Sequence, residues 1–530
     1  MNAPANLVIT GFMGSGKSAV GRLVAERLGR PFVDMDAVLA QRLGMSVPDV
    51  FARLGERFFR REEAALCREL AAQGGMVIAT GGGALVDRAN REAMAASGTL
   101  VCLTASADTL WERLSGTLDR PMLGSADRRA RLETLLAVRK PAYDEIPHQV
   151  STDGLALEQV ASRVEQIARL ADAHRERSLV VRYPGGSYPI FLTHGGLAEL
   201  GSYLQSRRLC GPVLVITDSN VGRQWADPAR AAIEAAGLSC HLFSFAAGES
   251  SKNLQTVQNL IEHMVATGLG RDTTVVALGG GVVGDTAGLV ASLYMRGVPF
   301  VQVPTSVLAM IDSSVGAKVA VDLPVGKNLV GAFKQPHLVL VDTALVDTLP
   351  MAERAAGLAE AVKAGIIADP KLFEMLEGES YELGEVIERS LRVKIEVVEA
   401  DPFESGRRAV LNLGHTFAHA YEALSHYSLR HGEAVAIGLV LAARLAASRN
   451  LCAEDLPSRV RACLARLGLQ TEPPAAAPEA VIAAMRTDKK RLSGRLRLVL
   501  PLGIGSVRVV DDLSEAELLQ FLRENGAAPA

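Results

Sequence analysis

The sequence predicts an α/β protein in which a nucleotide-binding domain with a parallel sheet precedes a two-lobed unit. The first lobe of that unit is α/β and the second is mainly helical. Two glycine-rich stretches, 11–16 and 279–284, each follow an apolar strand and open a helical pattern. Four of the ten histidines lie within 415–431. A length of 530 residues exceeds one ordinary core, so several domains are expected.

Composition describes an ordinary globular protein, with 48% hydrophobic and 22% charged residues. A net charge of −3 argues against a global electrostatic field for nucleic acid or an anionic membrane. The 6 cysteines show no CxxC spacing, which favours reduced thiols. Arg444 interrupts the best apolar run at 434–447, and the N-terminus lacks a basic signal region. We therefore expect a cytoplasmic protein with no nucleic-acid or membrane partner.

The first glycine stretch has the full G-x-x-x-x-G-K-S spacing between an apolar strand at 7–10 and a helical pattern ending at Leu28. Its backbone amides can surround phosphates, and the helix N-terminus adds a favourable dipole. Lys17 should reach the β- and γ-phosphates of a bound nucleotide, and the Ser18 hydroxyl should ligate Mg²⁺. The expected nucleotide contacts are Gly14, Ser15, Gly16, Lys17, Ser18 and Ala19.

The phosphate acceptor must be inferred from the motifs that follow this loop. Asp34 and Asp36 end a second strand, where alternation should place both carboxylates on one side. Taken singly, the later motifs fit surface charges or turns, but their order and spacing resemble shikimate kinase over the whole module. The motifs are Gly55 to Glu63 opening a helix, the triple glycine 81–83, Asp119-Arg120-Pro and Arg139-Lys-Pro-Ala-Tyr143.

The resemblance implies a role for each matched residue. Asp36 would bind the shikimate hydroxyls, Arg60 and Arg139 would hold the carboxylate, and Gly82 would present its backbone amide. Asp34 would lie near Mg²⁺ and the attacking hydroxyl. Arg120 would close over ATP and neutralise the transferring phosphoryl group. The segment 150–154 departs from the family because it lacks an arginine to stack on adenine.

A polar, charged segment separates the modules. We place the first domain at 1–172, a linker at 173–178, an α/β lobe at 179–345 and a mainly helical lobe at 346–530. Apolar strands at 212–218, 274–279 and 300–304 alternate with helical patterns, which predicts a parallel sheet. Segments 495–500 and 506–510 should add a small β element.

The second glycine stretch matches G-x-G-x-x-G after a strand, but the acid expected about twenty residues later is missing. A dinucleotide is therefore plausible only with further contacts. In the histidine cluster, His415 and His419 are four apart and should share a helix face, as a metal pair or as histidines satisfied in a core. The zinc-protease motif is excluded because its glutamate base is absent.

An ordered set of motifs resembles 3-dehydroquinate synthase across 178–530, so the chain resembles a fusion of this family with shikimate kinase. The motifs lie at 218–220, 248–252, 279–285, 294–297, 304–306, 312–318, 326–328, 357–363, 408–419 and 431–433.

The resemblance implies NAD⁺ and a catalytic Zn²⁺ or Co²⁺. The metal would be held by Glu360, His415 and His431, which leaves a position open for substrate. His419 would then serve substrate binding and proton transfer. The implied NAD contacts are Asp218, Asn220, Glu249, Lys252, Gly281, Val282, Asp285, Thr305, Ser306, Lys318, Lys327 and Thr348.

The implied substrate is 3-deoxy-arabino-heptulosonate 7-phosphate, which loses phosphate to give 3-dehydroquinate while NAD⁺ removes and returns a hydride. Arg296 would reach across an interface, so a homodimer is implied. The substrate-binding candidates are Arg296, Lys318, Asn328, Lys394, Arg408, Asn412 and Lys489, with Lys490 as the alternative to Lys489. The catalytic candidates are Asp312, Lys363, Glu404 and His419.

Two rivals remain for the second module. A metal-dependent polyol or alcohol dehydrogenase shares the two-lobed architecture, but its Gly-Gly-Gly-Ser-x-x-Asp pattern differs from the run at 279–288. A degenerate module kept as a scaffold is the other rival. The intact Lys17, Glu360, His415 and His431 argue against it.

Overall fold

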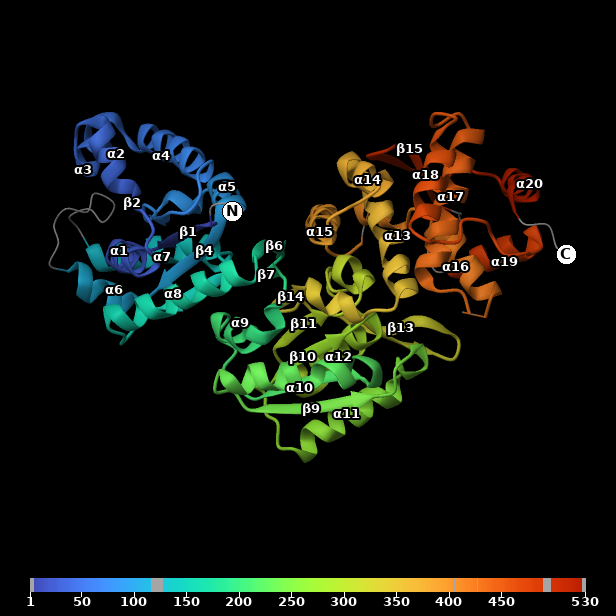
Figure 1. Cartoon of the computed structure of the whole chain (residues 1–530), viewed down its shortest axis with the longest axis horizontal. Helices are drawn as coiled ribbons and strands as arrows, with labels where there is room; N and C mark the ends of the chain where they lie inside the picture. The colour runs from blue at the N-terminus through green and yellow to red at the C-terminus, as the bar shows by residue number, and fades with distance from the viewer. Residues whose placement is uncertain (1–3, 116–126, 405, 427, 490–496, 527–530) are drawn as a thin grey trace. The chain divides into compact units, whose positions relative to one another are not determined.

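The computed structural model describes residues 4–115, 127–404, 406–426, 428–489 and 497–526 (Figure 1). The chain divides into two compact units. The first contains Met1–Pro212, Pro228–Cys240 and His337–Leu340, and the second contains Val213–Asp227, His241–Pro336 and Val341–Ala530.

A five-stranded parallel sheet forms the centre of the first unit, in the order β2-β3-β1-β4-β5. Side chains alternate across β1, so Leu7 and Ile9 face one core cluster and Val8 faces another. Figure 1 shows α4 and α5 on one side of this sheet and α8 on the other. The elements are β1 (Asn6–Gly11), β2 (Phe32–Asp34), β3 (Val77–Ala79), β4 (Gly98–Thr104), β5 (His148–Ser151), α1 (Lys17–Leu28), α4 (Glu56–Ala71), α5 (Arg88–Ser97) and α8 (Leu157–Ala173).

The prediction that the second strand extends to Asp36 was wrong. The strand β2 ends at Asp34, and Asp36 lies in the first turn of α2 (Met35–Leu43). Asp34 is the N-cap of that helix, and its Oδ1 accepts hydrogen bonds from the backbone nitrogens of Asp36 (3.1 Å) and Ala37 (3.4 Å). The Asp34 carboxylate thus caps two backbone amides that have no partner within the helix, and the chain turns from strand to helix at this residue. The position of Asp36 is therefore determined by the first turn of α2.

The first unit continues beyond the kinase-like module. The strands β6 (Arg177–Tyr183) and β7 (Gly186–Thr193) form an antiparallel hairpin, and α9 (Leu200–Ser206) follows. Gly185 adopts φ +100° at the hairpin turn, a conformation that favours glycine. The other helices of this region are α3 (Val47–Leu54), α6 (Ala107–Leu114) and α7 (Arg128–Asp144), with the 3₁₀ turn η1 (Ala84–Val86).

The second unit begins with strands in the order β11-β10-β8-β9, and the β11–β10 and β10–β8 pairs are parallel. β10 is buried along its whole length, as expected for an apolar strand covered on both faces. This arrangement confirms the predicted α/β lobe. The elements are β8 (Val213–Asp218), β9 (Cys240–Phe245), β10 (Thr274–Gly279), β11 (Phe300–Pro304), β12 (Lys318–Leu323), β13 (Gly326–Phe333), α11 (Leu254–Ala266) and α12 (Gly281–Leu293). The residues of α10 (Ser219–Ala235) and β14 (Leu338–Asp342) are divided between the two units.

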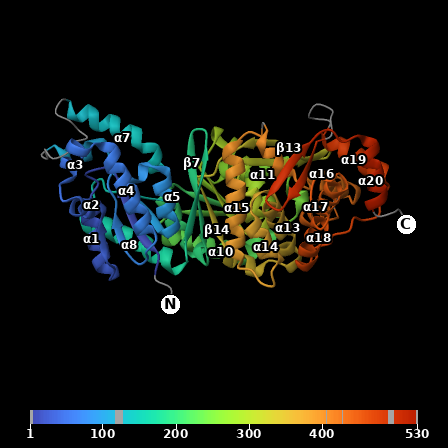
Figure 2. The ribbon, with the colours of Figure 1, turned by 90° about the horizontal axis from the view of Figure 1, so that it is seen from above.

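Helices dominate the rest of the second unit, as predicted, and a terminal hairpin of β15 and β16 supplies the expected β element. Figure 2 shows α13, α16 and α17 together. By length and composition α17 could cross a membrane, but 72% of that window is buried within the protein, as in a core helix. The elements are α13 (Met351–Ala368), α14 (Pro370–Glu377), α15 (Leu383–Ala400), η8 (Arg407–Asn412), α16 (His415–Leu424), α17 (His431–Ser448), α18 (Leu456–Arg466), α19 (Pro478–Lys489), β15 (Leu498–Gly503), β16 (Ser506–Val510) and α20 (Glu515–Asn525).

Candidate active sites

The loop between β1 and α1 has the backbone geometry of a phosphate cradle. Gly14 (φ +80°) and Gly16 (φ +91°) are left-handed, which side chains disfavour. Gly16 is the N-cap of α1, and no side chain caps this helix. The amides of the first turn are therefore available to an anion, as the helix dipole favours. Lys17, at the helix start, directs its Nζ to the carbonyl oxygen of Phe12 at 3.1 Å, across this loop.

The predicted acceptor residues meet beside this cradle. Arg139 Nη1 donates to the carbonyl oxygen of Gly82 at 3.0 Å, and the Tyr143 hydroxyl donates to the same oxygen. The guanidinium of Arg60 lies 2.6 Å from where a Cβ on Gly83 would stand, and the Asp36 carboxylate lies 2.8 Å from a Cβ on Gly81. The side chains of Asp36, Arg60 and Arg139 therefore lie around the triple glycine at 81–83. Arg120 lies outside the described residues.

Glu63 belongs to this cluster and was missed by the sequence analysis. Its side chain is buried, its Oε2 lies 2.6 Å from Arg60 Nη1, and its Oε1 lies 2.6 Å from a Cβ on Gly81. Burial raises the pKa of Glu63, although Arg60 opposes the shift. The signal was present in the sequence, because residues three apart on a helix share a face and Glu63 follows Arg60 at that spacing.

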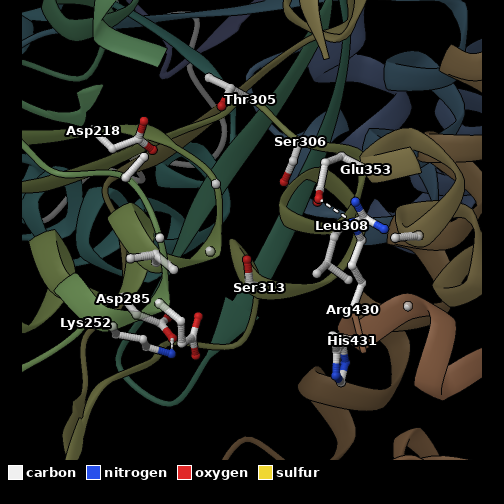
Figure 3. Close-up of a pocket in the computed structure, with 18 of the residues that line it drawn as sticks. Asp218, Lys252, Asp285, Thr305, Ser306, Leu308, Ser313, Glu353, Arg430 and His431 are labelled. Carbon is white, nitrogen blue, oxygen red and sulfur yellow. Dashed lines mark hydrogen bonds and ion pairs between the residues drawn. The ribbon is translucent and has the colours of Figure 1, made fainter. Parts of the chain in front are cut away.

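The second unit holds a cavity of about 1200 Å³ (Figure 3). Eleven of the twelve predicted NAD contacts line it, and the exception is Lys318, which is exposed and ion-paired with Glu404. Asp312, Asn328, His419 and His431 also line this cavity. The eleven are Asp218, Asn220, Glu249, Lys252, Gly281, Val282, Asp285, Thr305, Ser306, Lys327 and Thr348.

A buried ion pair lies on one wall of the cavity, where Figure 3 shows Lys252 facing Asp285. Lys252 Nζ is 2.6 Å from Asp285 Oδ2 and donates to Asn328 Oδ1 at 2.6 Å. Burial raises the pKa of Asp285 to about 6, against the opposing effect of Lys252. Gly280 is the N-cap of α12 without a side-chain cap, so this helix start also offers amides to an anion.

Three donors come together at the start of two helices and in the middle of a third. His415 is the first residue of α16, His431 is the first of α17, and Glu360 lies in α13. One donor atom from each lies within 4.8 Å of the others. His415 Nε2 and His431 Nε2 are 3.4 Å and 3.5 Å from Glu360 Oε1. Two imidazoles and a carboxylate form a donor set that suits zinc or a similar divalent metal.

The second nitrogen of each ring faces an oxygen acceptor, which favours the tautomer with an unprotonated Nε2. His415 Nδ1 lies 3.2 Å from the carbonyl oxygen of Leu413, and His431 Nδ1 lies 3.4 Å from Glu422 Oε1. Glu422 is buried, and the sequence analysis did not identify it. It lies seven residues after His415, two helical turns along the same face.

His419 contacts this group without joining the donor set. Its ring centroid lies 5.4 Å from that of His415 and 6.3 Å from that of His431. Helical spacing correctly placed His415 and His419 on one face, but the carboxylate of Glu360 lies beside His415 and His431.

Close helix packing makes this convergence possible. A Cβ on Gly432 would clash with the carbonyl of Ala356 in α13, and a Cβ on Gly438 would clash with the carbonyl of Gly414. The two glycines of α17 therefore allow α13 and the start of α16 to approach within backbone contact. This approach brings donors more than fifty residues apart in the chain to one point.

Buried charges surround the donors. Lys363 pairs with Glu360, and Lys394 pairs with Asp312. Burial alone would raise the pKa of the Glu360 carboxyl, but Lys363 and the two histidines hold it well below its usual value. Burial lowers the pKa of Lys394 although Asp312 opposes the shift. Glu360 Oε2 is ion-paired with Lys363, whereas Glu360 Oε1 accepts no hydrogen bond from the described residues and faces the Nε2 atoms of His415 and His431, so an electrophile fits there.

The remaining candidates are less closely grouped. Arg408 is buried and donates to the carbonyl oxygens of Gly316 and Pro402, both at 3.1 Å. Arg296, Glu404 and Asn412 are exposed and do not line the cavity. Lys489 ends α19, but its side chain and the whole of Lys490 lie outside the described part of the chain.

Comparisons with known proteins match the N-terminal part of the chain and the rest of it to two different enzyme families. The shikimate kinase model matches residues 13–169, the N-terminal 3-dehydroquinate synthase model matches 242–356, and the C-terminal model matches 357–491. The 3-dehydroquinate synthase of Xanthomonas axonopodis pv. citri (strain 306) is 47% identical over 355 residues, which cover 63% of this chain and 95% of that protein. The synthase of Synechococcus sp. (strain ATCC 27144 / PCC 6301 / SAUG 1402/1) is 42% identical over 357 residues, covering 65% of this chain and 97% of that protein.

Among solved structures, ValA, a 2-epi-5-epi-valiolone synthase from Streptomyces hygroscopicus subsp. jinggangensis 5008 with NAD⁺ and Zn²⁺ bound, is 30% identical. The TM-score is 0.60, and the alignment covers 65% of this chain and 98% of that one. The chain therefore belongs to the 3-dehydroquinate synthase family and carries a shikimate kinase as its N-terminal part, so that one polypeptide is a fusion of two enzymes.

Proposed function

We propose that the two activities of this shikimate-pathway enzyme use two separate sites, one in each compact unit. The shikimate kinase activity belongs to the loop at 11–18 and the residues around the triple glycine. The 3-dehydroquinate synthase activity belongs to the cavity and the donor group of the second unit. The observation that carries this proposal is the meeting of Glu360, His415 and His431 beside a cavity lined by the expected NAD contacts.

In the kinase site, the amides of residues 14–19, including Ala19, and the Lys17 ammonium would hold the ATP phosphates. We assign Mg²⁺ to the Ser18 hydroxyl, with Asp34 nearby. Asp34 uses its Oδ1 to cap α2, which fixes the orientation of this carboxylate.

Arg60 and Arg139 would bind the shikimate carboxylate, because planar guanidinium groups match its two oxygens. Asp36 would accept hydrogen bonds from the hydroxyls, and Gly82 leaves room for the ring. Arg120 would neutralise charge on the phosphoryl group. The test is Arg60→Ala, which should raise the KM for shikimate with little change in the KM for ATP. An unchanged shikimate KM would refute the assignment.

In the synthase site, bound NAD⁺ would supply a reversible hydride acceptor. The buried Lys252–Asp285 pair and the start of α12 would hold this dinucleotide. A divalent metal held by Glu360, His415 and His431 would supply Lewis-acid polarisation of a substrate hydroxyl. The Zn²⁺ reported in ValA supports this assignment.

The chain's own residues would bind and orient the anionic sugar phosphate. Lys363, which is buried and paired with Glu360, and Lys394, which is partly buried and paired with Asp312, would supply positive charge, and the buried Arg408 would supply more. Asp312 holds Lys394 in place, and His419 lies close enough to the donor group to carry a proton. We also assign Arg296, Lys318, Asn328, Asn412 and Lys489 to substrate binding and Glu404 to a supporting catalytic role.

A single purified sample tests whether the sites are separate. It should release phosphate from 3-deoxy-arabino-heptulosonate 7-phosphate and also phosphorylate shikimate with ATP. His431→Ala should abolish only phosphate release, because it removes a donor of the second unit. Loss of both activities in a folded variant would contradict two independent sites. Net NADH accumulation with a simple polyol, without phosphate release, would instead favour a dehydrogenase.

The remaining assignments are proposals of the same kind. We propose a homodimer formed through the synthase part, a cytoplasmic location, and domains at 1–172, 179–345 and 346–530 joined by 173–178. The dimer follows from the cross-interface role that the family pattern implies for Arg296, and its exposed side chain is compatible with that role. Sedimentation of the wild type and of Arg296→Ala would test it.

A further inference from the structure

Residues 174–208 pack against the kinase part inside the first compact unit. The family models leave this segment unassigned, because the kinase match ends at 169 and the synthase match begins at 242. The unit nevertheless continues to Pro212. Two polar clusters, the first buried and the second partly buried, join the segment to the end of the kinase sheet and to the end of α7.

The first cluster centres on Glu176. Its Oε1 lies 2.7 Å from His148 Nε2, and its Oε2 accepts a hydrogen bond from the Tyr203 hydroxyl at 2.8 Å. Phe191 of β7 packs against both rings, with centroid distances of 5.0 Å to His148 and 4.7 Å to Tyr203. The side chains of His148 and Glu176 are only 5% and 3% exposed. Breaking their contact would leave buried polar groups without hydrogen-bond partners, which costs free energy.

The second cluster centres on Glu145, which follows the last residue of α7. Its Oε2 accepts from Arg91 Nη2 at 2.6 Å and from Arg182 Nε of β6 at 3.1 Å. Burial alone would raise the pKa of Glu145, but the hydrogen bonds and charges of Arg182 and Arg91 lower it overall. Arg207 adds long hydrogen bonds from Nη1 to the carbonyl oxygens of Ile146 and Pro147, both at 3.4 Å.

This second cluster is connected to both sides of the shikimate site. Arg91 Nη1 also donates to the carbonyl oxygens of Leu85 (2.8 Å) and Val86 (2.7 Å), which follow the triple glycine. On the other side, the last two turns of α7 carry Arg139 and Tyr143, which hold the carbonyl of Gly82. Glu145 therefore links the end of α7 to the glycine loop, and Arg182 completes its charge pairing.

We propose that residues 174–208 complete the kinase, and that Arg182 is a positioning residue that holds the end of α7 and so places Arg139 in the shikimate site. The inference rests on the proposed roles of Arg139 and Gly82. In this fusion the first hairpin after the linker would therefore serve both enzymes, and the kinase would depend on a strand that follows its own family boundary.

The test compares full-length Arg182→Gln with Arg163→Gln, which removes an exposed arginine from α8. Arg182→Gln should raise the shikimate KM roughly 2- to 5-fold, the range of a partly buried ion pair, with kcat nearly unchanged. Hydrogen exchange should accelerate in residues 128–145, and Arg182→Lys should restore part of the affinity. An unchanged KM for ATP and an unchanged thermal unfolding transition report that the kinase part of the variant is folded.

Two results would overturn the proposal in distinguishable ways. If Arg139→Lys raises the shikimate KM but Arg182→Gln changes neither this KM nor the exchange of α7, the positioning role is wrong while the site assignment stands. If Arg139→Lys leaves the shikimate KM unchanged, the site assignment is wrong and the inference falls with it. Equal effects of Arg182→Gln and Arg163→Gln would also refute the positioning role.

Discussion

Replacing Glu422 should weaken metal binding without removing a metal donor. Glu422 lies 3.4 Å from His431 Nδ1, and its side chain is 8% exposed. Burial alone would raise the pKa of Glu422, but His431 outweighs burial and lowers it, so the carboxylate is charged at neutral pH. A charged acceptor at this distance orients the ring and increases the basicity of Nε2, the atom that faces Glu360.

Loss of an outer-shell carboxylate of this kind typically weakens metal binding 10- to 100-fold, which is about 1.4 to 2.7 kcal/mol. Glu422→Gln keeps an acceptor oxygen but removes the charge, so we expect the lower end of this range. Glu422→Ala removes both, so we expect the upper end. Glu433→Gln is the matched control, because Glu433 lies at the same end of α17 but pairs with Arg430.

The assay is a titration of the apoprotein with Co²⁺ against a competing chelator, followed by visible absorption, with Zn²⁺ displacement as a second measurement. Affinity should fall in the order wild type and Glu433→Gln, then Glu422→Gln, then Glu422→Ala. The kinase activity of each sample should stay constant, because its site lies in the first unit. Wild-type metal affinity in both Glu422 variants would refute the orienting role.

Three further predictions follow from buried contacts. Asp285→Asn leaves the Lys252 charge without its carboxylate and should lower the free energy of unfolding by about 3 kcal/mol; denaturant titration should show that adding Lys252→Met recovers most of this loss. Gly438→Ala places a methyl group against the carbonyl of Gly414. It should lower the free energy of unfolding by about 1 to 3 kcal/mol and weaken Co²⁺ binding. Unchanged Co²⁺ affinity would show that α16 and α17 separate without moving the histidines. Burial raises the pKa of the Cys102 thiol to about 12, so at pH 9 only about one thiol in a thousand is thiolate. Peptide mass spectrometry after alkylation should therefore find Cys210, which is exposed, modified well before Cys102 between pH 7 and pH 9, and equal rates would contradict the burial of Cys102.

Local patterns in the sequence identified the elements whose chemistry depends on near neighbours. The glycine loop at 11–16 needs only a strand, left-handed glycines and a helix start, and all of these lie within one short segment. The same holds for the shared helix face of His415 and His419, because helical spacing alone determines it. Local alternation misplaced Asp36, since the capping bonds of Asp34 end the strand two residues earlier.

Tertiary structure decided which of these local features meet. Glu360 lies beside His415 and His431 because glycines in α17 permit backbone contact with α13 and with the start of α16, and helical periodicity contains no information about that contact. The contact of Glu422 with His431 depends on the same packing. The sequence by itself thus determined the two glycine-rich loops, each between a strand and a helix, and the family pattern. Only the tertiary structure decided which charged side chains pair with one another. Buried charges need partners, and the packing of segments far apart in the sequence determines which charges are buried side by side.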